Sequence, residues 1–329
     1  MISIALCTYN GERYIREQLQ SIMEQTCQPD EIIICDDCSK DDTVTIVKDT
    51  LSIWSGTYKV FINEKNLGYR LNFQKAISKC TGDYIYLCDQ DDVWNADKIK
   101  TMQQAFYENP QAVMVFHDIF LVDCNLQILY KSFWEILRFN YHEFLKDNYN
   151  SLLESNVVQG AASAFKKDLF EYAVPFCELA HHDEWLALVA VARGKIVPIP
   201  KQLAQYRQHQ NVVGGLPLTL RQKFINIRSP KQLQVTMSLR LKKLCERSNI
   251  FDVYADKVSN LPSFTYKLDY PKFRLFMERR LGYIQSGSWK LICILPLYFT
   301  FARCPSNAIK TFIKDWFITF LLVHKVNFR

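Results

Sequence analysis

The chain has 329 residues, of which 49% are hydrophobic and 22% are charged, a balance typical of globular proteins and not of disordered ones. Glycine (10) and proline (11) are too few for a collagen-like or low-complexity chain. The net charge of +6 is unevenly distributed: residues 216–329 contain 20 Lys and Arg against 6 Asp and Glu, whereas residues 1–215 contain 20 against 28. We therefore expect an acidic domain over 1–215 and a basic, helical region over 216–329.

The cysteines and the apolar runs indicate where the chain resides. The 11 cysteines form no repeated Cys-x-x-Cys pattern at zinc spacing, and Cys35-Asp36-Asp37-Cys38 is a lone example of that pattern. No secretory leader precedes Ile2, so we expect reduced, buried thiols in a cytosolic protein. The longest late apolar runs, 291–302 and 317–323, are shorter than the ~20 residues that span a bilayer.

Short apolar runs alternate with amphipathic stretches over the first 125 residues, which predicts βαβ units and a largely parallel sheet. We expect strands at 2–9, 31–37, 58–63, 84–89 and 112–122, and helices at 12–25, 41–51, 68–79 and from about 97. Ser39 is placed to cap the second helix. Further along, we expect a strand at 157–165, a helix at 182–193, a short strand at 195–198, and helical segments at 239–247 and 273–284.

The most specific polar cluster is Asp89-Gln90-Asp91-Asp92, which follows the fourth predicted strand. Three carboxylates within four residues repel one another, and oxygen ligands without nearby Cys or His suit Mg²⁺ or Mn²⁺. An acidic turn that caps the next helix is the alternative interpretation. Ligands of open α/β sheets bind at the carboxyl ends of the strands, where this cluster lies.

Other polar motifs follow the earlier strands: Thr8-Tyr9-Asn10, the segment 36–43, and Asn66-Leu67-Gly68. Each alone is a common turn or helix cap. In this order, through about residue 215, they resemble the donor-nucleotide half of a family 2 glycosyltransferase. The resemblance implies the GT-A fold, an α/β architecture with a mixed, mainly parallel sheet flanked by helices. It implies nucleotide-sugar binding by Thr8, Tyr9, Asn10, Glu12, Asp37, Asn66, Gly68, Asn72, Asp89, Gln90, Arg207 and His209.

The resemblance also implies a metal ion and a catalytic base. Mn²⁺ or Mg²⁺ on the donor diphosphate would be held by Asp91 and Asp92, with Asp89 in support, and Asp37 would contact the nucleotide base. Asp183 aligns with the acid that acts as general base; an acid favoured by the helix dipole is the alternative interpretation. His182 replaces the family's usual Glu. The acceptor side would comprise Gly160, His182, Glu184 and Trp185.

These residue types suit the implied reaction. A sugar hydroxyl is a poor nucleophile, so a carboxylate has to accept its proton during attack on the anomeric carbon. The leaving nucleoside diphosphate develops charge that a divalent cation, Arg207 and His209 would stabilise. A single displacement of this kind inverts the anomeric centre.

Three other classes fit less well. A nicotinamide dehydrogenase would carry Gly-x-Gly-x-x-Gly after the first strand, where Thr8-Tyr9-Asn10-Gly11 stands instead. A sugar nucleotidyltransferase would carry a Gly-rich phosphate loop near the N-terminus. A non-catalytic GT-A scaffold is the remaining alternative, although such a chain would be expected to lose the acidic cluster or Asp183.

The stretches Cys88–Trp94 and Tyr206–His209 resemble those of bacterial rhamnosyltransferases of surface polysaccharide synthesis (capsule, O-antigen or cell wall). That resemblance implies a dTDP-L-rhamnose donor and a glycan or polyprenyl-diphosphate-linked acceptor. A UDP-hexose or UDP-N-acetylhexosamine donor is the alternative, because enzymes for those sugars share the same motifs.

The basic region 216–329 predicts attachment to an anionic membrane surface. Its apolar runs, 291–302 and 312–323, lie near Trp289, Tyr298 and Trp316, which suit the headgroup boundary. We expect a cytoplasmic protein bound peripherally to the inner face of the cell membrane. A helical subdomain that packs on the catalytic domain or forms a homo-oligomer is the alternative. Nucleic acid is not expected, because no compact Lys/Arg run accompanies an aromatic platform.

Overall fold

The computed structural model describes residues 1–146, 152, 156–209, 246, 249–257, 270–285, 291, 312 and 315. The chain divides into two compact units, one of 1–141 and 156–215 and the other of 142–155 and 216–329. Every candidate site residue named above lies in the first unit. The assignment of separate functions to 1–215 and 216–329 stays a prediction.

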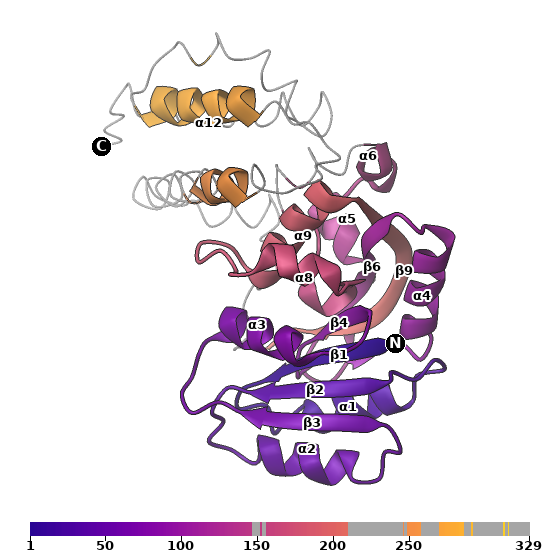
Figure 1. Cartoon of the computed structure of the whole chain (residues 1–329). Helices are drawn as coiled ribbons and strands as arrows, with labels where there is room; N and C mark the ends of the chain where they lie inside the picture. The colour runs from indigo at the N-terminus through magenta and orange to yellow at the C-terminus, as the bar shows by residue number, and fades with distance from the viewer. Residues whose placement is uncertain are drawn as a thin grey trace, which may run out of the picture. The chain divides into compact units, whose positions relative to one another are not determined.

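Four parallel strands form the first half of the sheet, in the spatial order β3-β2-β1-β4 (Figure 1). They are β1 (Ile2–Thr8), β2 (Glu31–Asp36), β3 (Thr57–Ile62) and β4 (Tyr84–Cys88). β1 and β2 are buried along their whole length, which explains their nearly continuous apolar sequences.

The second half of the sheet is mixed. β8 (Ser163–Lys166) pairs antiparallel with β4 and with β6 (Ala112–Val122), and β9 (Lys195–Arg207) pairs parallel with β6. Two short strands complete the sheet: β5 (Val93–Trp94), antiparallel to β9, and β7 (Ile128–Tyr130), antiparallel to β6. Because β8 alone is reversed between β4 and β6, the strands β6 and β9 run in the same direction as β1–β4. The carboxyl ends of β1, β2, β4, β6 and β9 therefore lie at one edge.

The helices between the strands locate the ligand-binding position of this edge. α1 (Ile15–Met23) and α2 (Thr43–Leu51) connect β1, β2 and β3 in one direction along the sheet. α3 (Tyr69–Lys79) then returns the chain past β1 to β4, and right-handed crossovers place it on the opposite face. The strand order thus reverses between β1 and β4, and such a switch point is where open α/β sheets bind ligands.

α9 (His182–Arg193) is apolar around almost its whole circumference and is buried, as expected of a core helix. It leads into the start of β9, so it runs against the strand direction and begins at the carboxyl edge. Further helices in the described part of the chain include α4 (Lys98–Glu108), α5 (Phe133–Leu137), α6 (Tyr141–Lys146), α8 (Asp168–Ala173), the 3₁₀ turn η1 (Gly160–Ala162) and α12 (Tyr270–Gln285).

Most predicted elements are confirmed, and three differ. Ser39 does not cap α2: its hydroxyl donates to Asp36 at 2.5 Å and accepts from the Asn10 N–H at 2.9 Å, and α2 begins only at Thr43. Of the expected strand 157–165, only 163–165 forms a strand, as part of β8; residues 160–162 form η1, where the Gly160 N–H donates to Asp183 of α9. The strand expected at 195–198 continues to residue 207 as β9.

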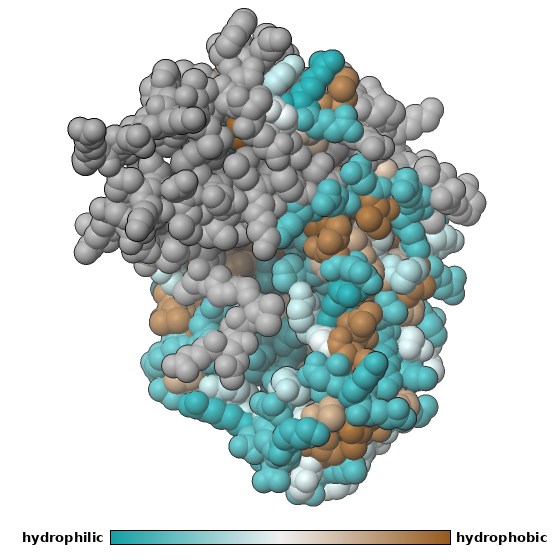
Figure 2. All heavy atoms as spheres, turned by 90° about the vertical axis from the view of Figure 1, so that its left-hand side faces the viewer, coloured by the Kyte–Doolittle hydropathy of each residue, from teal (hydrophilic) through white to brown (hydrophobic). Residues whose placement is uncertain are grey.

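The predicted helix 273–284 lies within α12, whereas 239–247, 291–302 and 312–323 lie largely outside the described residues. In the part of the chain that the structure describes, no helix is long and apolar enough to cross a membrane. The eight cysteines of that part form no disulfide. On the face shown in Figure 2, hydrophobic residues form separate patches within a mainly hydrophilic described surface.

Candidate active site

The loops after β1 and β2 are joined into one platform. The Thr8 hydroxyl donates to Asp36 at 2.7 Å, and the Asn10 side-chain oxygen accepts the Lys40 N–H at 2.8 Å. Asn10 adopts a positive φ of 48°, which asparagine tolerates. Glu12 accepts the Asp42 N–H at 3.1 Å. The ring of Tyr9, 47% exposed, remains at the surface of the platform.

Asp37 attaches the loop after β3 to the same platform. Its carboxylate is 2% exposed and accepts hydrogen bonds from Asn63 Nδ2 and from the N–H groups of Leu67 and Gly68, at 2.7–2.8 Å. Gly68 has a φ of 77°, a conformation that favours glycine. The predicted contact of Asp37 with a nucleotide base stays a prediction.

Two neighbours of Asp37 were also predicted to bind the donor. Asn66 is exposed, and its amide donates to the Asp37 carbonyl at 3.4 Å. Asn72 is 2% exposed and donates to the Cys35 carbonyl at 2.8 Å. The structure therefore places Asn66 at the surface and Asn72 in the interior, where it braces β2.

Gln90 joins the acidic loop to the loop after β1, at the switch point. Its side-chain oxygen accepts the Tyr9 N–H at 2.8 Å, and its amide donates to the Tyr9 carbonyl at 3.0 Å. A Cβ at Gly11 would lie 2.1 Å from the same oxygen, so this close approach requires glycine. Gln90 thus holds two loops together, and a contact with the donor stays a prediction.

The acidic cluster places its carboxylates in an unfavourable environment. Burial raises the pKa of Asp89 to about 7 and that of Asp92 well above its ordinary value, and the charges within the cluster raise both further. Asp92 is 1% exposed; its Oδ1 accepts the Arg207 N–H at 3.1 Å, and its Oδ2 has no hydrogen-bond partner among the described residues.

Lys98 faces this cluster from α4, and sequence reasoning missed it. Its ammonium group is buried, donates to the Ala161 carbonyl at 2.6 Å and lies 3.7 Å from the centroid of the Trp94 ring. Its charge lowers the pKa of Asp89 and Asp92, while its own pKa falls to about 7 through burial. The available signal was its position: Lys98 precedes Ile99 on the buried stripe of α4.

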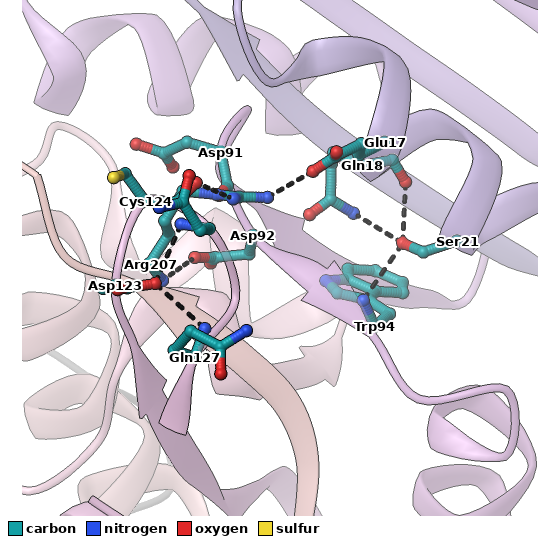
Figure 3. A network of polar contacts seen from close by, with 11 residues as sticks. Glu17, Gln18, Ser21, Asp91, Asp92, Trp94, Asp123, Cys124, Gln127 and Arg207 are labelled. Atoms are coloured by element: carbon teal, nitrogen blue, oxygen red, sulfur yellow. Dashed lines mark hydrogen bonds and ion pairs between the residues drawn. The ribbon is translucent and has the colours of Figure 1, made fainter. Parts of the chain in front are cut away.

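The end of β9 lies beside the cluster, where Arg207 meets Asp91 and Asp92 (Figure 3). Arg207 is 2% exposed; its guanidinium donates to the carbonyls of Asp91 and Cys124 at 2.8 Å and pairs with Glu17 at 2.5 Å. His209 Nε2 lies 2.7 Å from Asp91 Oδ2. The structure brings both predicted cations to the acidic loop, but it turns the guanidinium of Arg207 toward protein groups.

Asp183 occupies the first turn of α9 at the same edge. Its Oδ2 accepts the Gly160 N–H at 3.0 Å, and its Oδ1 accepts the Glu184 N–H at 2.6 Å and Asn156 Nδ2 at 3.3 Å. Burial raises its pKa to about 6, against the lowering effect of His181 and of these backbone hydrogen bonds. The charge of Asp183 raises the pKa of Asp89, so the two carboxylates are close enough to interact.

The residues predicted for the acceptor side divide into two groups. His182 is 7% exposed, stacks on Phe73 with centroids 4.0 Å apart, and its ring nitrogens lack hydrogen-bond partners in the described part of the chain. Its pKa is lowered to about 3 by burial, so it is neutral. Gly160 lies against it, since a Cβ there would be 2.8 Å from His182 Nε2. Glu184 and Trp185 are buried, and the Trp185 indole donates to the Ala173 carbonyl at 2.7 Å.

Two further features lie beside these residues. Tyr206 alternates with Arg207 along β9 and so points to the opposite face of the sheet. Burial raises the pKa of its phenol, and the charges of Asp92, Asp89, Asp91 and Asp183 raise it further. A cavity of about 240 Å³ is lined by residues 67–70 and 178–181, and there the Tyr69 hydroxyl lies 2.7 Å from His181 Nδ1.

The donor set of the acidic loop fits a divalent cation. No group of three metal-ligating side chains is already arranged around one point in the described part of the chain. However, the loop combines oxygen ligands of the type that Mg²⁺ and Mn²⁺ prefer with a buried carboxylate oxygen on Asp92 that has no partner among the described residues. A cation would relieve both the mutual repulsion and this unsatisfied oxygen.

Comparison with solved structures supports the fold. Staphylococcus aureus TarS (residues 1–349) in complex with UDP-GlcNAc aligns with a TM-score of 0.55 and 16% identity, over 100% of this chain and 93% of that one. The mannosyltransferase PcManGT of Pyrobaculum calidifontis, in complex with GDP-Man and Mn²⁺, aligns with a TM-score of 0.54 and 15% identity, over 100% and 88%. The predicted GT-A fold is thereby confirmed.

Sequence relatives identify the family. An uncharacterized protein of Mycobacterium tuberculosis is 27% identical over 68% of this chain and 63% of its own length, so the chain spans less than two thirds of that relative. The dTDP-rhamnosyl transferase RfbG of Shigella flexneri is 40% identical over 29% of this chain and 34% of its own. Residues 3–172, just over half of the chain, match the family described as "Glycosyl transferase family 2". The chain therefore belongs to glycosyl transferase family 2.

Proposed function

We propose that the protein is an inverting glycosyltransferase that moves a sugar from a nucleoside-diphosphate donor to a hydroxyl of a glycan or lipid-linked oligosaccharide in bacterial surface polysaccharide synthesis. The observation that carries the proposal is the meeting of Asp183 with the acidic loop at one edge of the sheet, where the charge of Asp183 raises the pKa of Asp89. A candidate base and the candidate diphosphate-binding group thus lie at the same edge of the sheet.

In the proposed reaction, the nucleotide lies on the platform formed by the loops after β1, β2 and β3, and its diphosphate lies at the switch point. Asp183 accepts the proton of the acceptor hydroxyl as that oxygen attacks the anomeric carbon. The Gly160 and Glu184 N–H groups hold the carboxylate in place. Attack from the side opposite the leaving diphosphate inverts the anomeric configuration.

Asp91 and Asp92, with Asp89 in support, would hold Mn²⁺ or Mg²⁺. Such a cation neutralises the charge that develops on the leaving diphosphate. His209, which contacts Asp91 in this structure, would lie beside it. The fit of the donor set supports this assignment, and PcManGT was solved with Mn²⁺.

For the donor we propose dTDP-L-rhamnose. The support is the 40% identity to the dTDP-rhamnosyl transferase RfbG over 103 residues. The alternative is a UDP-hexose or UDP-N-acetylhexosamine, since TarS was solved with UDP-GlcNAc. Nucleotide release measured across dTDP-, UDP- and GDP-sugars, with Mn²⁺ and with EDTA, tests both: preferential release from dTDP-rhamnose is expected. Release from no donor under any condition would favour the non-catalytic scaffold instead.

We further propose that residues 216–329 bring the catalytic domain to the inner face of the cell membrane, where a polyprenyl-diphosphate-linked acceptor presents its sugar. The excess of 20 basic over 6 acidic residues supports attraction to anionic lipid, at about 1 kcal/mol for each well-placed cation. Association of this region with a second copy of the chain is the alternative.

A further inference from the structure

One face of α1 holds the segment that leaves the acidic loop. Glu17 and Ser21 are four residues apart, so they lie on the same side of the helix, and Gln25 follows just beyond its end. The Ser21 hydroxyl accepts the Trp94 N–H at 3.0 Å, and the Gln25 amide donates to the Asn95 carbonyl at 2.7 Å. Glu17, one turn earlier, reaches Arg207 instead (Figure 3).

Arg207 connects Glu17 to the acidic loop itself. Its side chain donates to the Asp91 carbonyl at 2.8 Å, and its main-chain N–H donates to Asp92 Oδ1 at 3.1 Å. The guanidinium also lies 4.5 Å from the centroid of the Tyr14 ring, a cation–π contact at the start of α1. A cation that is only 2% exposed requires a counter-charge, and the Glu17 carboxylate at 2.5 Å supplies one.

We propose that Arg207 and Glu17 are positioning residues for the acidic loop: Glu17 orients the guanidinium, and Arg207 holds Asp91 and Asp92 so that their carboxylates face the diphosphate and its cation. The inference deepens the proposed function and rests on it. It replaces the expected contact between Arg207 and the donor diphosphate, because the guanidinium is turned into the protein and is engaged by Asp91, Cys124 and Glu17.

The loop needs such support because three like charges within four residues drive it to spread apart. Three attachments hold the loop: Gln90, between Asp89 and Asp91, bonds to Tyr9; Arg207 bonds to Asp91 and Asp92; and Ser21 bonds to Trp94 after the cluster. Without Glu17, the Arg207 guanidinium loses the carboxylate that fixes its position. Its hold on the acidic loop then loosens, while the hydrogen bonds of Gln90 to Tyr9 and of Trp94 to Ser21 remain. The expected result is weakened cation binding by a folded protein.

Glu17→Ala in the full-length chain tests the proposal, and Glu24→Gln is the matched control. Glu24 lies at the end of the same helix and is exposed, so its change alters net charge without touching Arg207. Binding of Mn²⁺ is measured by electron paramagnetic resonance with saturating dTDP and, separately, UDP. Loss of the groups that orient metal ligands costs about 10–100-fold in affinity or activity. We expect ~10-fold weaker Mn²⁺ binding for Glu17→Ala, a smaller loss for Glu17→Gln, and none for Glu24→Gln.

The outcomes separate this inference from the proposed function. A purely structural role would lower the melting temperature of the metal-free protein but leave the Mn²⁺ affinity of its folded fraction unchanged, and that result overturns the inference. If Glu17→Ala fails to fold, an unchanged Mn²⁺ affinity of Glu17→Gln also overturns the inference. If the wild-type protein itself binds no Mn²⁺ with either nucleotide, the metal proposal fails, and the positioning role fails with it.

Discussion

Replacing Asp183 by Asn should slow transfer strongly and at the same time stabilise the fold at pH 8. The carboxylate accepts hydrogen bonds from two backbone N–H groups, yet burial still raises its pKa from an ordinary value near 3.8 to about 6. An acid with a raised pKa binds its proton more tightly in the folded state than in the unfolded state. The protonated Asp183 carboxyl therefore contributes its full stabilisation of the fold below pH 4, and this stabilisation is lost as the pH rises through 6.

The magnitude follows from the shift. About 2 pKa units at 1.36 kcal/mol each give a ceiling of ~3 kcal/mol of destabilisation by the ionised group at pH 8. Because the Asp183 side chain is partly exposed, the destabilisation by its ionised form falls to ~2 kcal/mol. In the variant, the single amide oxygen of Asn accepts only one of the two backbone hydrogen bonds, which costs ~1 kcal/mol. The net expectation for Asp183→Asn is a gain of ~1 kcal/mol at pH 8 that shrinks between pH 6 and pH 4.

Two measurements check this prediction. Denaturant unfolding of wild type and variant at pH 8 and pH 4.5, in EDTA, gives the difference in unfolding free energy. Transfer by the variant should fall ~10²–10⁴-fold, because the amide cannot accept the proton. Wild-type transfer should decline about tenfold per pH unit below 6. A variant with the same stability difference at both pH values refutes the burial argument, and near-normal transfer refutes the base assignment.

Three further predictions address the metal, the stereochemistry and the basic region. Asp91→Asn should remove most turnover and weaken nucleotide binding; normal activity of that variant in EDTA would contradict the metal assignment. The product linkage should be inverted relative to the donor, and an NMR coupling constant that shows retention would overturn the single displacement. The intact chain should float with anionic liposomes and dissociate at high salt, whereas a fragment that ends near residue 215 should not; an intact chain that never floats would favour the assembly role.

The strands and helices of the first unit were predictable because local signals agreed with the tertiary structure. Apolar runs end at Asn10, Asp36 and Asp89, residues that favour turns and tolerate strained backbone. The carboxyl-edge location of the motifs then followed from strand direction alone. α9 was predicted with its observed bounds, since its polar first turn and long apolar remainder are typical of a core helix.

The direction in which each polar side chain points was not predictable. Gln90, Arg207 and Asn72 carry the same donors and acceptors whether they bind a ligand or a neighbouring loop. Their partners lie far along the chain: Tyr9 is 81 residues from Gln90, and Glu17 is 190 residues from Arg207. Only the folded chain brings these partners together. Lys98 was missed for a related reason, because a lysine in an amphipathic helix is usually solvent-facing, and its partners Trp94 and Ala161 are brought to it only by the fold.

The position of β9 affects how the protein is made. It is the last strand of the described sheet in sequence, yet it lies inside the sheet between β6 and β5. More than a hundred residues separate the acidic loop from Arg207, which at about 5–20 residues per second leaves that loop roughly 6–20 s without its partner during synthesis. From the synthesis of β6 until that of β9, the edge of β6 that pairs with β9 stays unpaired, which favours aggregation. A recombinant fragment limited to the family match at 3–172 would retain that edge, so it has to extend through residue 209.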